Sequence, residues 1–194
     1  MINHEADLEV CGEAESAREA LVNIGKLNPD LALVDITLKG TNGIELLKSI
    51  KAQYSKLPVL VLSMHDESLY AERALRAGAR GYVMKQEPPE QVMGAIRRVL
   101  QGELYLSPSM GTQMIGKLVG TPSGSTSPVD VLSDRELEVL QFIGQGHGTR
   151  QIAEELNLSV KTIESHRAHI KEKLNIKTAP EIVRFAVQWV NDLA

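Results

Sequence analysis

The chain has 194 residues, 43% of them hydrophobic, so it is long enough for one or two small domains with buried cores. Its formal net charge of −4 excludes a uniformly basic protein, so any surface that binds nucleic acid must be local. The lack of a signal-peptide pattern, and of any apolar run near the roughly 18 residues of a membrane span, predicts a soluble cytoplasmic protein.

The first 101 residues alternate short apolar runs with helical patterns. Such alternation predicts an α/β fold, a parallel sheet with helices on both faces. Cys11 is the single cysteine, which excludes an internal disulfide and suits a reducing compartment. The predicted strands are 8–11, 31–34, 59–62 and 81–84, and the predicted helices are about 13–27, 43–53, 67–77 and 88–101.

Polar side chains stand at the carboxyl ends of three predicted strands: Asp35, Ser63 and Lys85. Ligand sites in an open parallel sheet form at these ends, so the three side chains can converge on one small anion. A carboxylate can attack phosphorus, a lysine provides a point charge, and a hydroxyl provides a hydrogen bond. An aspartate alone is often only a turn residue, but three such ends and the turn KGTNG favour a phosphate site. Tyr82 could equally be core, and Thr37 could hydrogen-bond in the turn or face solvent.

Four segments occur in the order and spacing of a receiver domain: LALVDITLKGTNGIEL, PVLVLSMHD, AGARGYVMK and PPEQVMGAIRRVL. Over about residues 5–101 the chain resembles the receiver domain of two-component response regulators. The resemblance implies a flavodoxin-like fold in which Asp35 is the phosphoacceptor and Lys85 contacts the phosphate. It also implies that Ser63 is the switch hydroxyl and that Tyr82 is the aromatic side chain that moves with it.

A receiver of this kind would begin roughly twenty residues earlier, with a first strand, an acidic pair and a first helix. We therefore expect an N-terminally incomplete fold, with only the tail of that helix at residues 1–6. In the strand order 2-1-3-4-5 the first strand lies inside the sheet, so its loss would leave two strand edges facing a gap. Three explanations compete: a chain start placed too late, a domain that repacks or swaps, or a receiver that no longer takes phosphate.

The acidic pair also matters for metal binding. A complete receiver is expected to bind Mg²⁺, which usually takes one or two carboxylates plus phosphate oxygens. Asp35 and the carbonyl of Thr37 remain as weak candidate ligands. Glu13 could replace a lost carboxylate, although a solvated position at a helix start is the favoured interpretation. We therefore expect weak Mg²⁺ binding and slow phosphorylation of Asp35 by small phosphodonors.

The segment GTPSGSTSP, at 120–128, is nearly all Gly, Pro, Ser and Thr and cannot pack a core. It predicts a linker at 102–128, with room for a short helix before it ends. The chain is thus divided into a receiver-like domain at 1–101, this linker, and a second domain at 129–194.

The second domain shows helical patterns throughout. Ser133 opens LSDRELEVLQFIGQG, and Glu136 three residues later predicts a capping box at a helix start. A helix at about 149–156, the break NLS and a helix at about 160–174 then predict a helix-turn-helix.

The second helix of this pair carries the candidate DNA contacts. Steps of 100° place Ile163, Ile170 and Leu174 on an inner stripe, while outer residues can meet base edges and flanking cations can meet phosphates. Residues 160–177 hold five Lys or Arg and two Glu, which is a basic patch on an acidic domain. A solvated helix in an ordinary bundle is the alternative interpretation. The candidate DNA-binding residues are Lys161, Thr162, Glu164, Ser165, Arg167, Ala168, Lys171 and Lys173.

The sequence LSDRELEVLQFIGQGHGTRQIAEELNLSVKTIESHRAHIKEKLNI resembles the LuxR-type DNA-binding domain of NarL/FixJ-like response regulators. The resemblance covers about residues 131–190. It implies four helices, recognition of double-stranded DNA by the helix at 160–174, and a homodimer on DNA. Val183 and Val190 lie partly off the apolar stripe of the last helix and are candidate dimer contacts.

Together the two resemblances imply a transcriptional regulator of a two-component phosphorelay, which a sensor histidine kinase phosphorylates on Asp35 when the receiver is complete. One alternative is a degenerate receiver that serves only for dimerisation, with DNA binding independent of phosphorylation. A less favoured alternative is a phosphatase-like enzyme with Asp35 as nucleophile, because that chemistry wants a second aspartate where Thr37 stands. We therefore expect no enzymatic activity.

Overall fold

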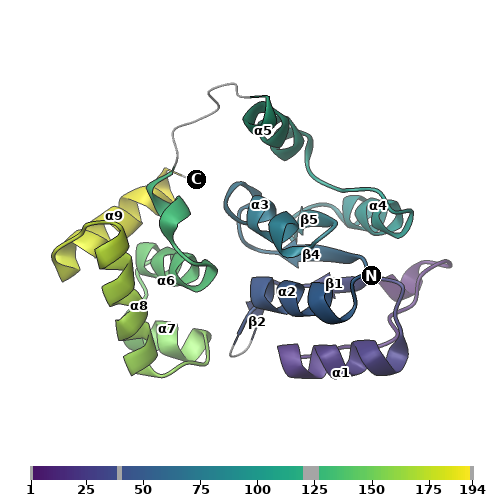
Figure 1. Ribbon diagram of the computed structural model, residues 1–194, viewed down its shortest axis with the longest axis horizontal. Coiled ribbons are helices and arrows are strands. Elements are labelled where there is room, and N and C mark those ends of the chain that lie inside the picture. Colours follow the sequence, from purple (N-terminus) through teal and green to yellow (C-terminus); the bar gives the residue numbers. More distant parts are fainter. Residues whose placement is uncertain (1, 39–40, 120–126, 193–194) are drawn as a thin grey trace. The chain divides into compact units, whose positions relative to one another are not determined.

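Figure 1 shows the computed structural model of the chain, which describes residues 2–38, 41–119 and 127–192. The chain divides into two compact units, Met1–Ser123 and Gly124–Ala194. The predicted turn KGTNG and the predicted linker lie partly outside the described residues, at 39–40 and 120–126. Within the described ranges, no helix is long and apolar enough to span a membrane.

A three-stranded parallel sheet forms the centre of the first unit (Figure 1). Its strands are β1 (Ala32–Val34), β4 (Val59–Ser63) and β5 (Gly81–Met84), in the order β1-β4-β5. Leu33 of β1 lies opposite Leu60 of β4. Three of the four predicted strands are therefore confirmed, and their carboxyl ends lie along one edge of the sheet.

The α-helices of the first unit begin where the sequence offers a cap. The Ser16 hydroxyl accepts a hydrogen bond from the Glu19 N–H at 3.3 Å, which fixes the start of α1. The Asp66 carboxylate accepts from the Ser68 N–H at 2.8 Å and begins α3 in the same way. The helices of this unit are α1 (Ala17–Leu27), α2 (Gly43–Gln53), α3 (Glu67–Ala77), α4 (Pro89–Leu100) and α5 (Pro108–Leu118). The smaller elements are the 3₁₀ helix η1 (Ile2–His4) and the antiparallel pair β2 (Thr37–Leu38) and β3 (Thr41–Asn42).

The predicted strand at 8–11 is wrong. Those residues are described but belong to no strand, and the Val10 N–H donates to the Asn3 side-chain oxygen at 2.9 Å. An alternating pattern becomes a strand only beside another strand edge, and this segment is separated from β1 by a cavity of about 840 Å³. The helix after it also begins later than predicted, at Ala17, because Ser16 caps it.

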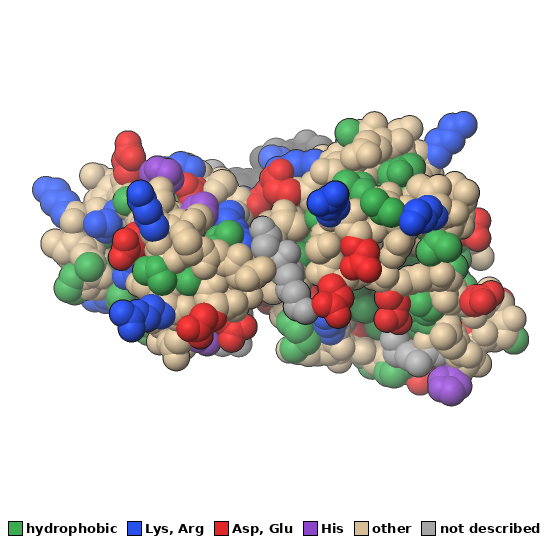
Figure 2. Space-filling view, turned by 90° about the horizontal axis from the view of Figure 1, so that it is seen from below, with side chains coloured by type: hydrophobic (Ala, Val, Ile, Leu, Met, Phe, Trp, Pro, Cys, Tyr) green, Lys and Arg blue, Asp and Glu red, His purple; other side chains and the backbone are tan. Residues whose placement is uncertain are grey.

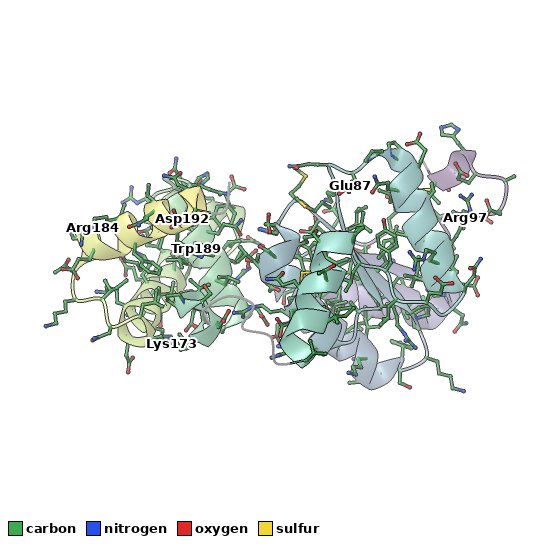
Figure 3. The ribbon with its side chains drawn as sticks, turned by 90° about the horizontal axis from the view of Figure 1, so that it is seen from above. Glu87, Arg97, Lys173, Arg184, Trp189 and Asp192 are labelled. Carbon is green, nitrogen blue, oxygen red and sulfur yellow. The ribbon has the colours of Figure 1, made fainter. Side chains whose placement is uncertain are left out.

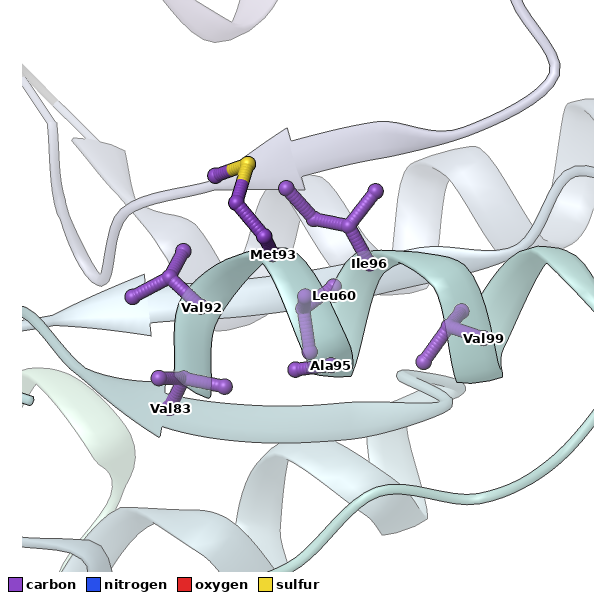
Figure 4. Close-up of a cluster of buried hydrophobic side chains, with 7 residues drawn as sticks. All are labelled: Leu60, Val83, Val92, Met93, Ala95, Ile96 and Val99. Atoms are coloured by element: carbon purple, nitrogen blue, oxygen red, sulfur yellow. The ribbon is translucent and has the colours of Figure 1, made fainter. Parts of the chain in front are cut away.

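One hydrophobic cluster of the first unit lies between α4 and the sheet, and further buried side chains come from α2 and α3. Leu60 of β4 and Val83 of β5 pack with apolar side chains of α4 (Figure 4). The α4 residues recur at the spacing of one helix face, as a core-facing helix requires. Burying one such leucine contributes about 1.5 to 3 kcal/mol. The α4 members of this cluster are Val92, Met93, Ala95, Ile96 and Val99.

Helix α5 lies inside the segment predicted as a linker, yet it packs on the first unit. Its Met110 is only 2% exposed, and the Ser109 hydroxyl donates to the Glu67 carboxylate of α3 at 3.0 Å. The domain limits at 101 and 129 stay predictions.

The second unit is a helical bundle, as predicted. Ser133 and Glu136 form the predicted capping box, since the Glu136 carboxylate accepts from the Ser133 N–H at 2.8 Å and the Ser133 hydroxyl accepts in return at 3.4 Å. Asn157 takes a positive φ of 50° in the short turn of the helix-turn-helix. Leu140 and Ile152 are fully buried between the helices. The elements are η2 (Pro128–Val131), α6 (Asp134–Gly144), α7 (Thr149–Glu155), α8 (Val160–Lys173) and α9 (Ala179–Asn191).

Candidate phosphoacceptor site and nucleic-acid interface

Asp35 and Lys85 meet at the carboxyl edge of the parallel sheet. Asp35 directly follows β1 and Lys85 directly follows β5, and the Lys85 Nζ lies 2.6 Å from the Asp35 Oδ2. The Lys85 N–H also donates to the Ser63 carbonyl at 2.8 Å, which holds the end of β5 against the end of β4. The backbone of Gly43 passes so close to Asp35 that a Cβ there would collide with the Asp35 carbonyl. Tight backbone packing therefore positions the carboxylate.

Ser63 ends β4, the strand between β1 and β5, but it forms no side-chain hydrogen bond to this ion pair among the described residues. It is fully buried, and its hydroxyl accepts from the His65 N–H at 3.2 Å. Asp35 and Lys85 are therefore in direct contact, while the Ser63 hydroxyl bonds to the loop after β4, and its role as the switch hydroxyl stays a prediction.

Tyr82 is fully buried and reaches the same loop. Its hydroxyl donates to the His65 carbonyl at 2.8 Å. Burial raises the pKa of Tyr82 above its usual range, although the nearby Ser63 hydroxyl lowers it in part. The phenol therefore stays a neutral donor, and it links the core to the loop after β4.

His65 is a site residue that our interpretation of the sequence missed. Its Nε2 lies 2.8 Å from the Thr37 Oγ1, and the Thr37 N–H donates to the Asp35 Oδ1 at 3.3 Å. His65 lies in the bend after β4, where no strand or helix periodicity applies, so the sequence pattern gave no signal for it. The Thr37 side chain bonds to His65 and is therefore not simply solvated.

The Asp35 carboxylate faces a lysine, and the described residues around it form no cluster of metal ligands. Receiver domains generally bind Mg²⁺, an ion that takes octahedral oxygen ligands. Among the residues the structure describes, no group of three or more His, Cys, Asp or Glu side chains could hold a metal ion. Lys85 is the cation that faces Asp35, and Glu13 is an exposed residue that lines the cavity beside β1.

Helix α8 presents the predicted outer face to solvent. Ile163 and Ile170 are fully buried, as the inner stripe requires, and the Ser159 hydroxyl caps the helix by accepting from the Thr162 N–H at 3.0 Å. Burial lowers the pKa of Arg167, which still remains a cation. The exposed residues of the predicted set are Lys161, Glu164, Ser165, Ala168 and Lys173, and the half-buried ones are Thr162, Arg167 and Lys171.

Lys173 has a structural partner that the sequence did not predict. Its Nζ lies 2.6 Å from the Glu136 carboxylate of α6, whose side chain is only 5% exposed (Figure 3 labels Lys173). Burial raises the pKa of Glu136, but the Lys173 ammonium and the Ser133 N–H outweigh it and hold that pKa below its usual range. Lys173 therefore ties α8 to α6. Figure 2 shows Lys and Arg side chains interspersed with Asp and Glu on one face of this unit.

One of the two candidate dimer contacts, Val190, is half-buried, and its role in a dimer stays a prediction. Val190 packs against Gly144 of α6, where any Cβ would collide with its Cγ2. The apolar stripe of α9 is therefore wider than 100° steps predicted, and it includes Val190. Val183 is 40% exposed, and Val187 one turn along is 38% exposed.

The chain matches two family models in tandem. One, described as the response regulator receiver domain, matches residues 1–97. The other, described as bacterial regulatory proteins of the luxR family, matches residues 130–186. The comparisons do not confirm the expected loss of a first βα unit, and its three explanations stay predictions.

Relatives and solved structures extend this similarity over both units. The oxygen regulatory protein NreC of Staphylococcus carnosus (strain TM300) is 37% identical over 193 residues, with 97% of this chain and 89% of the relative covered. RcsB from Salmonella enterica serovar Typhimurium, solved bound to promoter rprA with the phosphomimetic BeF3−, is 25% identical. The match has a TM-score of 0.59 and covers 96% of this chain and 89% of that one. A LuxR-family response regulator from Aurantimonas sp. SI85-9A1 is 34% identical, with a TM-score of 0.51 over 55% of this chain and 76% of that one.

Proposed function

Because this chain belongs to the two-component response regulators with a receiver and a LuxR-type DNA-binding domain, which regulate transcription, we propose specific residues for its two tasks. Asp35 accepts a phosphoryl group from a sensor histidine kinase, and α8 recognises double-stranded DNA. The relatives are transcriptional regulators, and we propose that this chain is likewise no enzyme and acts in the cytoplasm.

The observation that supports the first assignment is the 2.6 Å contact between Lys85 and Asp35 at the carboxyl edge of the sheet. An Asp35 carboxylate oxygen forms a bond to phosphorus while the bond from phosphorus to the donor nitrogen breaks, and that nitrogen keeps the electron pair. Lys85 offsets the repulsion between the carboxylate and the incoming phosphoryl oxygens. At about 4 Å and an effective dielectric near 20, one such charge pair contributes roughly 4 kcal/mol.

A second cation beside Asp35 would offset a further charge pair of this size. The described residues offer no cluster of three or more metal-binding side chains that would hold a metal ion there. Without that second cation, the barrier to phosphoryl transfer is higher by roughly 4 kcal/mol, which corresponds to about a thousandfold in rate. We therefore expect slow phosphorylation of Asp35. The test is incubation of the full chain with radiolabelled acetyl phosphate. Asp35→Asn should abolish the label and Lys85→Gln should reduce it, whereas Lys26→Gln, an exposed lysine of α1, should have no effect. Label that survives Asp35→Asn would overturn the assignment.

The exposed outer face of α8, above the buried Ile163 and Ile170, supports the DNA assignment. Phosphate contacts release counterions, so affinity for duplex DNA should fall steeply with salt. Lys171→Gln should weaken binding to all DNA sequences similarly. It should also reduce the slope of log affinity against log salt concentration by about 1. Glu164→Gln or Ser165→Ala should instead change the preferred sequence. Arg184→Gln on α9 is the matched control (Figure 3 labels Arg184), and equal effects of Arg184 and Lys171 would contradict the assignment.

A two-fold dimer is proposed for the DNA-bound form. A helix-turn-helix of this size contacts one half-site, so two copies should occupy two half-sites about one helical turn apart. The exposed Val183 and Val187 of α9 are the apolar contact we propose. Footprinting at saturating protein should protect both half-sites in the parent chain, and Val183→Lys should reduce protection to single half-sites at higher concentration. Protection of one half-site by the parent chain would contradict the dimer.

A second candidate function is supported by the lack of a carboxylate cluster beside Asp35 among the described residues. In it, the receiver serves only for dimerisation, and DNA binding is independent of phosphate. DNA affinity measured before and after phosphodonor treatment separates the two. An unchanged affinity, with Asp35 shown by mass to be phosphorylated, would favour the second candidate.

A further inference from the structure

An extended segment leads from α4 into α5 (Figure 1), and it is bonded to β5 on the way. The Tyr105 N–H donates to the Arg80 carbonyl at 3.0 Å, and the Tyr82 N–H donates to the Tyr105 carbonyl at 3.1 Å. Gly81 lies opposite Tyr105, and a Cβ at Gly81 would collide with the Tyr105 carbonyl. These bonds attach the segment to the edge of β5 that faces away from β4.

A single carboxylate of α3 then holds the first turn of α5. The Ser109 hydroxyl donates to the Glu67 Oε1 at 3.0 Å, and the Ser107 hydroxyl donates to the same oxygen. The Ser107 hydroxyl also caps α5, because it accepts from the Met110 N–H at 3.1 Å. The Met110 side chain is only 2% exposed. We call Glu67, Ser107, Ser109 and Met110 the clasp.

The rest of α5 contributes little to keeping the helix in place. The helix has 11 residues, and isolated helices shorter than about 12 residues are marginal in water. Gly111 lies in its interior, where glycine is less favourable than alanine. A Cβ at Gly111 would meet no atom of the described residues within 4 Å, so packing does not require this glycine. Ile115 and Val119 are 62% and 69% exposed. The clasp therefore decides whether α5 stays docked.

The carboxylate of the clasp directly follows the loop that reaches the phosphate site. In that loop the His65 Nε2 lies 2.8 Å from the Thr37 Oγ1, and the Thr37 N–H donates to the Asp35 carboxylate. The Ser63 hydroxyl accepts from the His65 N–H, so it is turned toward the loop. For this hydroxyl to bond a phosphoryl group on Asp35, residues 64–67 must shift. The clasp opposes that shift because it fixes Glu67.

We propose that the clasp is an autoinhibitory contact. Docked α5 restrains the loop after β4 and slows phosphorylation of Asp35, and phosphorylation in turn releases α5. The proposal rests on the proposed function of Asp35. The two effects are reciprocal, because a phosphoryl group and a docked α5 favour different positions of the same loop. Release would add the residues of α5 to the connection between the receiver and the DNA-binding domain.

The test measures both ends of this coupling in the full chain. Exchange of the Gly111 amide, which donates to the Ser107 carbonyl at 2.9 Å, reports the opening of α5. Radiolabelled acetyl phosphate reports the initial rate of Asp35 labelling. The double change Ser107→Ala and Ser109→Ala should raise opening about tenfold, because it removes a helix cap and two bonds to a carboxylate. The labelling rate should rise by up to the same factor. Gly111→Ala should instead lower opening by about two- to fivefold and slow the labelling.

The reciprocal arm compares exchange at Gly111 before and after treatment with acetyl phosphate. Exchange should quicken in the parent chain and stay unchanged in Asp35→Asn. Thr112→Val is the matched control for the serine changes, because Thr112 is exposed on α5 and its hydroxyl donates to the Pro108 carbonyl at 2.9 Å rather than to α3. Its opening and its labelling rate should equal those of the parent chain.

A second variant keeps the test decisive if the lost hydroxyls change opening too little. Met110→Ala removes the buried side chain and should raise opening more than tenfold, with thermal unfolding as the check on its fold. Labelling at the parent rate in a variant whose α5 has opened would overturn the proposal, as would unchanged exchange at Gly111 in both variants. Absence of Asp35-dependent label from the parent chain and every variant would contradict the proposed function, and this proposal with it.

Discussion

The two units of this chain differ in how they pair their charged side chains and their backbone edges. In the second unit, Arg135 of α6 pairs at 2.7 Å with Glu138, whose side chain is fully buried. In the first unit, Arg97 of α4 (labelled in Figure 3) holds Asp7 at 2.8 Å, with side chains that are 38% and 57% exposed. Both units cap their helices locally, but the second also buries this ion pair, while the first leaves the edge of β1 beside a cavity.

The largest expected effect compares one core leucine in each unit. Leu140→Ala in α6 should cost close to the upper end of the range of about 2 to 5 kcal/mol for buried leucines, because a closed bundle relaxes little around a new void. Leu60→Ala in β4 should cost nearer the lower end, because β1 can shift toward the cavity beside it. Both leucines are fully buried, so the pair is matched in burial.

The single tryptophan separates the two measurements. Trp189 lies on α9 of the second unit, so its fluorescence follows that unit during urea unfolding, and exchange of core amides follows the first unit (Figure 3). Leu140→Ala should move the tryptophan transition and Leu60→Ala should leave it nearly unchanged. Equal free-energy losses in both units would break the comparison, because they would show that the first unit is as rigid as the second.

The same comparison explains what could be predicted from the sequence. Ser133 and Glu136 mark a helix start through hydrogen bonds between residues only three apart, so the sequence alone predicted this cap. The two helices of the helix-turn-helix were predicted to within about a residue at each end. The strand expected at 8–11 depends on a neighbouring edge far along the chain, and no local pattern can report that edge. Asp35 and Lys85 were predicted to meet because parallel strands end at one edge. His65 was missed because loop geometry, not periodicity, turns it toward Thr37.

The next effect concerns the buried arginine pair. Arg135→Met should cost about 3 kcal/mol, because it leaves the Glu138 carboxylate buried without its cation. Arg135 also donates to the Leu156 carbonyl at 3.1 Å, so the turn into α8 should loosen as well. Tryptophan-detected urea unfolding measures the loss, and Arg184→Met on α9 is the control. The double change Arg135→Met with Glu138→Leu should recover most of it, and failure of that recovery would contradict the buried-charge explanation.

A smaller effect concerns pH and Glu136. Lys173 and the Ser133 N–H hold the pKa of this buried carboxylate below its usual range. A folded-state pKa below the unfolded value stabilises the fold above the unfolded pKa, which is about 4.3. That stability is lost as pH falls through the folded pKa. Lys173→Met should therefore shrink the difference in tryptophan-detected stability between neutral pH and pH below about 4. A pH profile identical to that of the parent chain would contradict the role of Lys173 as the partner of Glu136.

The smallest effect should come from Arg97, the exposed counterpart of Arg135. Arg97→Gln removes bonds to Asp7 at 2.8 Å and to Glu5 at 2.6 Å, but water replaces them because all three side chains are at least a third exposed. The free energy of global unfolding should scarcely change, and any change should become smaller with added salt.

The local consequence is larger, since these pairs hold the N-terminal segment beside α4. Exchange of the Val10 amide, which donates to Asn3 at 2.9 Å, should quicken while amides of β4 stay protected. The Arg97 guanidinium also lowers the pKa of Asp7, so the parent chain should lose this local protection as pH falls below the usual range of Asp, and Arg97→Gln should not. A loss of global stability as large as that of Arg135→Met would mean that the N-terminal segment is part of the cooperative core, and the contrast between an open and a closed unit would fail.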